Sequence, residues 1–539
     1  MIAVQAEEGE RAVVAEFFEL FKTPWRFFRD GGQTDVLICS QANVPQTDAG
    51  LLLIYGGKPK PFDEEMGLQP SAHQPNTMLS CKGGRIPVYG SSLAFGASTD
   101  AGLKHESSGE RAIVKFNTGG RTIVRIGYDL FQEIHHLLTR GQPEANAAIP
   151  ALEIHIALLR DLIVGASIPL VEIPPVPDGC KWIACLTHDM DHIGIRNHRF
   201  DHTMFGFLYR ATIGSVLDVC RGRKNWRQLG TNCLAALKLP LVHLGLAKDF
   251  WQSFDRYLAI ETGLNSTFFV IPRKNEPGMD TRGNRPARRA AKYDAAGLGE
   301  PLKQLQSAGD EIAVHGIDAW RDSAAGRQER EIISRLTGAA ETGVRMHWLF
   351  FDERSPALLE AAGYGYDSTV GYNQTVGYRA GTTQVFKPMT TKELLELPLH
   401  LMDTALFYSG YLNIAPAQME ETVRPLIANT VRFGGVLTVN WHDRSVAPER
   451  LWDAAYVRLL GQLRSNGACF LTAARTVSWF RKRRAVIFEQ AGSTVKIKIP
   501  AGVDTRLPGL CARSFKPDAG GGKFFETPLP DGGEISLGA

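Results

Sequence analysis

The sequence predicts an α/β protein whose main part is a distorted (β/α) barrel, and three observations predict it. From Lys181 onward, short apolar runs alternate with helical segments over about 300 residues, as in a parallel α/β sheet. His and Asp follow these apolar runs, where a parallel barrel places the carboxyl ends of its strands. The 539 residues also exceed the size of a single core, so further domains are expected.

Residues 1–172 predict a separate N-terminal α/β domain. The prolines of Ile173-Pro174-Pro175-Val176-Pro177 mark its end, because proline fixes the backbone and removes hydrogen-bond donors. The elements expected before this boundary are a helix over 12–21, strands over 35–39 and 50–55, a hairpin over 112–127 and a helix over 149–165.

The barrel is predicted over residues 173–484. One of its helices is marked clearly by Ser355 and Pro356 at its start and by Gly363 at its end. The number of strand and helix patterns favours a closed or nearly closed barrel. Strands are expected at 181–186, 266–272, 311–316, 343–349, 394–402 and 434–443, and helices at 249–263, 300–309, 330–343, 355–363 and 417–435.

Residues 485–539 predict a small β appendage, because 493–500 alternates with a period of two and the remainder is rich in Gly and Pro. The basic cluster Arg481-Lys482-Arg483-Arg484 precedes it. A solvated helix end is the expected role of this cluster, and a surface for phospholipid or glycan phosphate is the alternative.

Composition and charge exclude several classes of protein. The chain has 60 basic and 57 acidic residues, a balance that argues against a nucleic-acid partner. We expect no membrane span, since even the best candidate, around Leu237–Trp251, is interrupted by charge. The N-terminus has acids where a secretory signal needs a basic flank, which predicts a cytoplasmic protein. The eight cysteines contain no CxxC pair, so reduced thiols are expected.

Chemically active residues collect at the ends of five predicted strands, which bring them to one rim. Asp189 and Asp191 are two residues apart in an extended segment, so their carboxylates face one site. Their like charges would repel unless a cation lies between them or one keeps a proton. A divalent metal bound by Asp191 and His315 would hold Asp189 beside a water molecule. The residues at the rim are Asp189, Asp191, His192, His315, Arg345, His347, His400, Asp403, His442 and Asp443.

The region from about 181 to 480 resembles the polysaccharide deacetylase superfamily, carbohydrate esterase family 4, in its branch with a long N-terminal extension. The motifs that carry the resemblance are 187–191, 309–315, 343–345, 363–368 and 439–442. The resemblance implies that Asp189 is the catalytic base and that Asp191 and His315 bind a divalent metal, with Zn²⁺ as the first choice. It further implies that Arg345 holds the base, that His442 is the general acid, and that Asp403 orients His442.

One position departs from the family pattern. The family has a second metal-binding His four residues after the first, where this chain has Ala319, which cannot act as a ligand. His347 is our first choice for the third ligand, because it follows Arg345 by two residues and points the same way on a strand. Asp318 and His192 are the second choices. His188 alternates away from the two acids, which favours a structural role.

The resemblance implies a metal-dependent hydrolase that removes an N-acetyl group from an amino sugar. A nucleotide- or lipid-linked glycan precursor for surface polysaccharide is the expected partner. Trp320, Trp348 and Trp441 are candidates for stacking on sugar rings, with core packing as the alternative. Hydrolysis of a non-sugar amide and a catalytically inactive glycan-binding or scaffold protein, the latter suggested by Ala319, are the alternative functions.

Overall fold

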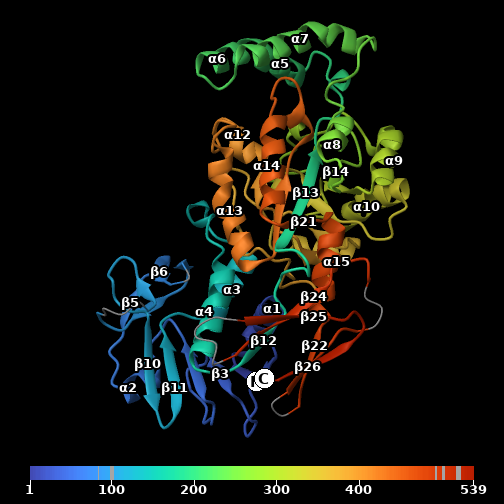
Figure 1. Ribbon diagram of the computed structural model, residues 1–539. Coiled ribbons are helices and arrows are strands. Elements are labelled where there is room, and N and C mark those ends of the chain that lie inside the picture. Colours follow the sequence, from blue (N-terminus) through green and yellow to red (C-terminus); the bar gives the residue numbers. More distant parts are fainter. Residues whose placement is uncertain (83, 98–101, 492–493, 501–503, 517–523, 539) are drawn as a thin grey trace. The chain divides into compact units, whose positions relative to one another are not determined.

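The chain divides into two compact units (Figure 1). The computed structural model describes residues 1–82, 84–97, 102–491, 494–500, 504–516 and 524–538. Unit 1 is assembled from three segments, Met1–Gly179, Tyr378–Met389 and Ser478–Ala539, and unit 2 from Cys180–Gly377 and Thr390–Val477. Each unit is described below by itself.

Unit 2 contains a curled parallel sheet in the order β18-β17-β16-β15-β14-β13-β20-β19. The predicted fold class is confirmed, since helices alternate with these strands along the chain. The strands are β13 (Trp182–Met190), β14 (Thr267–Val270), β15 (Glu311–Gly316), β16 (Val344–Met346), β17 (Tyr366–Asp367), β18 (Leu395–Glu396), β19 (Leu401–Met402) and β20 (Val436–Asn440), with β21 (Ala468–Phe470) beside β13. Their helices are α8 (Phe254–Ile260), α9 (Gly299–Ala308), α10 (Ser323–Thr337), α11 (Ser355–Ala362), α12 (Asp403–Phe407), α13 (Met419–Phe433), α14 (Asp453–Ser465) and the start of α15 (Ala473–Arg484).

The sheet of unit 2 is nearly closed by a single segment between its two edge strands. The chain passes from β18 directly to β19, and backbone bonds on both sides hold this passage. Leu399 N donates to Val370 O at 2.9 Å, and His400 N donates to Thr438 O at 3.2 Å. The sequence pattern at 394–402, predicted as one strand, is therefore two short strands on opposite edges of the sheet.

A disulfide joins Cys180 to Cys469 at the amino end of β13, where Ile183 pairs with Cys469. The expectation that all eight cysteines are reduced is wrong for this pair. The two residues are 289 positions apart, and only the parallel pairing of β13 with β21 brings their Cα atoms to 5.8 Å. Sequence spacing alone could not reveal such a pair.

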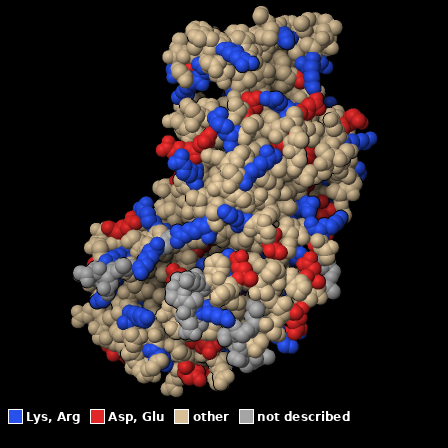
Figure 2. All heavy atoms as spheres, viewed as in Figure 1, with Lys and Arg blue, Asp and Glu red and all other residues tan. Residues whose placement is uncertain are grey.

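A helical insert follows β13, at the carboxyl end of that strand. It consists of α5 (His202–Tyr209), a π-turn (Arg210–Gly214), α6 (Ser215–Cys220) and α7 (Trp226–His243). In Figure 1 these green helices form a layer beyond the strands of unit 2, and in Figure 2 the same region shows mainly uncharged atoms with Lys and Arg among them. In the part of the chain that the structure describes, no helix has the length and apolarity needed to cross a membrane.

Unit 1 contains a second, smaller α/β sheet in the order β10-β11-β4-β3-β1-β2, parallel except for β10. The predicted N-terminal helix, strands and hairpin are confirmed. The elements are β1 (Ile2–Gln5), α1 (Arg11–Phe21), β2 (Trp25–Phe27), β3 (Val36–Cys39), β4 (Leu51–Tyr55), β10 (Ile113–Thr118), β11 (Arg121–Ile126), α3 (Leu130–Thr139) and α4 (Ala151–Gly165). Short antiparallel strands β5 (Ser71–His73), β6 (Thr77–Cys81), β7 (Gly84–Val88), β8 (Ser92–Ala94) and β9 (Lys104–His105) lie outside this sheet.

The C-terminal strands are part of unit 1, whereas the sequence predicted a separate appendage over 485–539. Strand β12 (Leu170–Glu172) pairs with a strand from the far end of the chain, and the two share one sheet. The C-terminal strands are β22 (Ile487–Ala491), β23 (Thr494–Lys498), β24 (Leu510–Phe515), β25 (Phe524–Leu529) and β26 (Glu534–Gly538).

The expectation of a solvated helix end at Arg481–Arg484 is wrong for most of the cluster. The Arg483 side chain is buried and donates to the carbonyl oxygens of Leu20 and Ile173 at 2.9 and 2.7 Å. Arg484 forms an ion pair with Glu16 at 2.7 Å, and Lys482 forms one with Asp531 at 2.7 Å. These basic side chains hold unit 1 together.

Candidate active site

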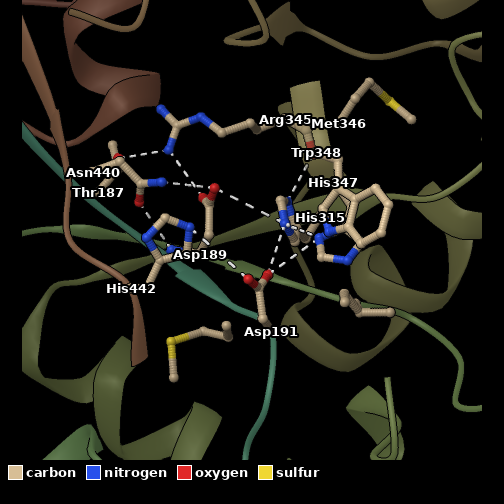
Figure 3. Close-up of polar contacts among 12 residues, drawn as sticks. Thr187, Asp189, Asp191, His315, Arg345, Met346, His347, Trp348, Asn440 and His442 are labelled. Atoms are coloured by element: carbon tan, nitrogen blue, oxygen red, sulfur yellow. Dashed lines mark hydrogen bonds and ion pairs between the residues drawn. The ribbon is translucent and has the colours of Figure 1, made fainter. Parts of the chain in front are cut away.

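The candidate site lies at the carboxyl end of the sheet of unit 2 (Figure 3). Its centre is Asp189, near the end of β13, which is buried on both faces. The Asp189 carboxylate accepts a hydrogen bond from Arg345 at 3.0 Å and one from Asn440 at 2.8 Å. Because both donors are buried, the carboxylate is fixed in one orientation with its charge compensated.

Arg345 itself is held rigidly on β16. Its guanidinium donates to Thr187 at 2.6 Å and to both the carbonyl and the hydroxyl of Ser368, at 3.0 and 2.9 Å, and it lies 4.4 Å from the centre of the Phe269 ring. The side chain is completely buried. Arg345 therefore presents a fixed positive charge to Asp189, as the resemblance implied.

Asp191, His315 and His347 meet beside Asp189 and could hold a metal ion. Asp191 Oδ1 lies 3.2 Å from His315 Nε2 and 3.2 Å from His347 Nδ1, and these two nitrogens are 3.0 Å apart. A tetrahedral ion with bonds of about 2.0 Å would separate its ligand atoms by about 3.3 Å. The three atoms are thus spaced as ligands of one ion.

One of these three atoms, Asp191 Oδ1, lacks a hydrogen bond that would satisfy it without a cation. Asp191 Oδ1 is buried and has no geometrically acceptable hydrogen bond, although two imidazole nitrogens face it. His315 Nδ1 lies 2.9 Å from the carbonyl oxygen of Arg345, which assigns the proton to Nδ1 and directs the Nε2 lone pair at Asp191. A buried anionic oxygen and a lone pair that face each other favour a cation between them.

His347 reaches this position through a strained turn. Strand β16 ends at Met346, and the next residues form a 3-10 turn in which Trp348 and Leu349 have φ values of 66° and 53°. Left-handed backbone at a residue other than glycine costs about 1 kcal/mol or more. Arg289, which is buried, stabilises the turn by donating to the carbonyl oxygen of His347 at 3.0 Å.

His442, two residues after the end of β20, faces the candidate metal triad and is held by Asp403. The Asp403 carboxylate lies 2.6 Å from His442 Nδ1 and accepts the backbone N–H of His442 at 2.7 Å, and it also accepts the Ser445 hydroxyl. His442 Nε2 lies 3.9 Å from Asp191 Oδ2. The imidazole therefore points its second nitrogen into the site, with Asp403 behind it.

Neighbouring charges shift the pKa values of Asp189 and His442 in opposite directions. Burial opposes ionisation of Asp189, but the Arg345 guanidinium lowers the pKa of this carboxyl below its usual value. Burial also opposes a charge on His442, but Asp403 and the nearby carboxylates raise the pKa of the imidazole to about 10. At neutral pH Asp189 is thus a carboxylate and His442 an imidazolium, and both lie next to the triad.

Two residues that support the site were missed by the sequence analysis. Asn440 donates to Asp189 and also accepts its backbone N–H at 3.1 Å. The available signal was the period of two, since Asn440 stands two residues before His442 in the strand predicted over 434–443. Arg289 lies in a 3-10 turn outside any motif, and no pattern in the sequence marked it.

Other predicted candidates lie outside the triad. His188 points to the opposite face of β13, where it bonds to Glu261 at 2.9 Å, so the expected structural role is confirmed. The two second-choice ligands, His192 and Asp318, are not brought to the other ligand atoms, and Asp318 accepts the backbone N–H of Met279 at 2.9 Å. Ala319 is buried against Gly326. His347 takes the third position in the triad instead.

The three tryptophans proposed for sugar stacking differ in their exposure to solvent. Trp441 is fully buried and stacks on Tyr456, with ring centres 4.9 Å apart, and Trp320 is 5% exposed. Trp348 is 42% exposed and lies beside His347 (Figure 3). Core packing is thus the observed fate of Trp320 and Trp441, and Trp348 alone of the three offers an aromatic face next to the site.

Fold and site together define a (β/α) protein with a candidate metal centre of one Asp and two His beside a buried Asp–Arg pair. Neither protein-family models nor curated proteins match the chain. Among solved structures, it is similar to a probable polysaccharide deacetylase from Pseudomonas aeruginosa PAO1, at 15% identity over 57% of this chain and 94% of that chain, with a TM-score of 0.34.

Further similar structures are the polysaccharide deacetylase Bc1974 from Bacillus cereus and the peptidoglycan deacetylase PdaC from Bacillus subtilis. The first is 10% identical over 52% of this chain and 88% of that chain, with a TM-score of 0.24. The second is 12% identical over 58% of this chain and 96% of that chain, with a TM-score of 0.24.

Proposed function

We propose that the chain is a metal-dependent carbohydrate N-deacetylase, a hydrolase that releases acetate from an N-acetylated amino sugar. The observation that carries the proposal is the arrangement of three kinds of group at one rim. Asp189 is a buried carboxylate held ionised, His442 is an imidazole held charged by Asp403, and both lie next to the triad of Asp191, His315 and His347. Amide hydrolysis needs a base, an acid and a centre that stabilises negative charge.

Each residue has one step in the proposed reaction. Asp189 accepts a proton from the water whose oxygen attacks the acetyl carbonyl carbon, while Arg345 and Asn440 keep the carboxylate in place. His442 donates its Nε2 proton to the amide nitrogen as the C–N bond breaks, which releases acetate and a free amine. A divalent ion held by Asp191, His315 and His347, for which Zn²⁺ is our choice, would lower the pKa of water and polarise the carbonyl.

The substrate that we propose is an N-acetylated sugar carried on a nucleotide or lipid, as a precursor of surface polysaccharide. The exposed indole of Trp348 beside His347 supports a sugar substrate, since an aromatic face packs on the C–H face of a pyranose ring. Of the two alternative functions, the inactive binding protein loses its main support. It was suggested by Ala319, yet His347 completes the triad without that position.

Metal removal and reconstitution test the proposal. The protein stripped with a chelator should release no acetate from N-acetylglucosamine oligosaccharides, and added Zn²⁺ should restore release. His347→Ala should bind the ion at least tenfold more weakly, because a ligand is lost. His135→Ala, which removes an exposed imidazole from unit 1, is the matched control and should retain both the ion and acetate release. Acetate release that survives complete removal of metal would contradict the proposed function.

A further inference from the structure

The insert between β13 and β14 exposes an unusual amount of apolar surface. Most of the large apolar side chains that are exposed in the described part of the chain lie between residues 200 and 246. The exposed fractions reach 84% for Phe200, 78% for Trp226 and 76% for Leu237. Large exposed apolar patches mark interaction surfaces, because contact of apolar side chains with water is unfavourable and a bound partner removes it.

Helix α7 is apolar on two opposite faces. One face packs into the core of the insert through Ala235, Leu239 and Val242. The opposite face carries a second apolar stripe at helical spacing, and every member of this stripe is exposed. A helix that packs against a protein on one side normally has a polar outer face. The exposed stripe consists of Trp226, Leu234, Leu237 and Leu241, and Leu244 continues it directly after the end of the helix.

The first half of the insert repeats this pattern. Met204, Phe207 and Ala211 face the same core as α7, while another set of apolar side chains faces solvent. The spacing of the exposed set follows the helical repeat across α5, the π-turn and α6. Its members are Phe205, Tyr209, Ile213, Val216 and Leu217. Both helical layers of the insert thus expose apolar residues in addition to those that they bury.

Basic residues flank the apolar stripes. Only two acids lie between 200 and 247 in the sequence, and both are engaged, since Asp201 caps α5 and Asp218 pairs with Lys224 at 3.3 Å. The same range holds six basic residues, three times the number of acids. The exposed ones are Arg221, Arg223, Arg227 and Lys238, and the exposed Arg199 and Lys248 lie directly outside the range.

The insert is fixed to the rim that carries the candidate active site. Lys224 Nζ donates to the carbonyl oxygen of Glu449 at 3.0 Å, and the Asn232 amide donates to that of Pro448. Both acceptors lie in the loop that begins with His442. On the other side, Arg196, five residues after Asp191, donates to the carbonyl oxygen of Val242 at 2.7 Å. The apolar surface and the site therefore belong to the same end of unit 2.

We propose that residues 200–246 form a docking surface for an anionic phospholipid bilayer, into which the apolar stripes insert without crossing it. An amphipathic helix that combines Trp and Leu with flanking Lys and Arg is typical of interfacial membrane binding. A second copy of the chain fits less well, because a two-fold contact would bring the same excess of positive charge to both sides of the interface. Resting on the proposed function, the inference also selects the substrate: an N-acetylated sugar whose lipid carrier lies in that bilayer.

Vesicle binding by the full chain tests the docking surface. The protein should sediment with vesicles of phosphatidylcholine and phosphatidylglycerol and far less with phosphatidylcholine alone. The triple variant Leu234→Gln, Leu237→Gln, Leu241→Gln should bind at least tenfold more weakly, since it removes apolar area. Val457→Gln, which changes an exposed apolar residue of α14, is the matched control and should bind as the unaltered protein does.

A charge variant separates the electrostatic contribution to vesicle binding from the apolar contribution. Arg227→Gln with Lys238→Gln should weaken binding to the anionic vesicles by about fivefold for each charge and should reduce the effect of salt. Circular dichroism melting of every variant checks that the insert remains folded.

Two results would overturn the docking surface. One is sedimentation with neither vesicle. The other is a dimer of the unaltered protein that the triple variant converts to a monomer, which would assign the stripes to a second copy. Neither assay depends on catalysis, so vesicle binding without acetate release would reject the proposed function and keep the docking surface, and the converse result would do the opposite.

Discussion

Both units gather polar side chains at the carboxyl ends of a parallel sheet, but the two rims differ in how these groups are satisfied. In unit 1, a cavity of about 690 Å³ lies at the ends of β3, β4 and β11. Lys60, at its wall, donates to the carbonyl oxygens of Ser40 and Gln41 at 2.7 and 2.6 Å. Asp129 accepts two backbone N–H groups at the start of α3. These groups stabilise the loops of the domain itself.

In unit 2 the corresponding groups face one another, and one of them, the buried Asp191 Oδ1, accepts no hydrogen bond. Asp191 Oδ1 and the nitrogens of His315 and His347 lie within 3.2 Å of each other, and no hydrogen bond satisfies the oxygen. The fold therefore collects polar residues at both rims, whereas among the residues that the structure describes three possible metal ligands converge at the second rim alone. Unmet hydrogen-bonding and charge requirements, rather than polar composition, distinguish a candidate catalytic rim from a structural one.

Changing one aspartate at each rim should give the largest effect and tests the difference between the two rims most directly. Asp189→Asn removes the base, so acetate release should fall by about 10²–10⁴-fold. Asp129→Asn should leave release nearly unchanged, because Asn caps a helix as well as Asp does. Initial rates of acetate release from metal-loaded protein measure both. Equal losses in the two variants would remove the distinction between the rims.

A second difference concerns a buried acid of unit 1, Glu153, whose protonation affects the stability of the protein. Burial raises the pKa of Glu153 to about 7, although Thr382 and Thr383 donate to the carboxyl group. Since this folded-state pKa lies above the unfolded value of about 4.3, stability is present at lower pH and is lost as the pH rises through about 7. Glu153→Gln should reduce this loss, by up to about 3 kcal/mol between about pH 5 and about pH 8.

Denaturant unfolding of the full chain at the two pH values measures the effect of Glu153→Gln. Glu64→Gln, at an exposed site in the same unit, is the control and should leave the pH dependence as it is. A pH dependence in Glu153→Gln as steep as that of the unaltered protein would show that the Glu153 carboxyl is already ionised in the folded state.

The smallest effect is expected from the residue behind the general acid. Asp403→Asn leaves the imidazole of His442 in place, so release should fall by about tenfold to a hundredfold, no more than the lower limit of about 10² for loss of acid catalysis. Asp403 raises the pKa of His442, and a general acid works only below its pKa. As the pH rises, acetate release by Asp403→Asn should therefore begin to decline at a lower pH than release by the unaltered protein.

The pH profile separates this role from a merely structural one. Asp453→Asn, which removes the partner of Arg256 at the surface of the same unit, is the control and should keep the original alkaline limb. An unshifted limb in Asp403→Asn would assign Asp403 to structure alone.

The sequence could predict those parts of the site that follow from strand periodicity. Asp189 and Asp191, like Arg345 and His347, are pairs two residues apart, and a local rule places each pair on one side. Helix and strand types in both units followed from apolar spacing for the same reason. His347 was the first choice as third ligand, although a strained turn rather than a regular strand brings it to the triad.

The features that escaped prediction depend on contacts between distant segments. Arg289 donates a hydrogen bond to the turn of His347 from a segment without a recognisable sequence pattern. Cys180 comes close to Cys469 only through strand pairing. Arg483 looked like a solvated charge because its acceptors, Leu20 and Ile173, are backbone carbonyls far away in the chain. The insert of α5–α7 was missed because a helix that is apolar on two faces shows no clear amphipathic period.

The assembly of unit 1 from three segments has a consequence for the order in which the protein is made. The ribosome releases residues 1–179 long before Tyr378–Met389, yet Gln142 and Leu152 donate backbone hydrogen bonds into that later segment, to Arg379 and Gly381. Strand β12 must wait longer still, until β24 has been translated. Unit 2 can complete its sheet earlier, because its last strand ends at Phe470. The first domain to be synthesised is thus the last to be finished.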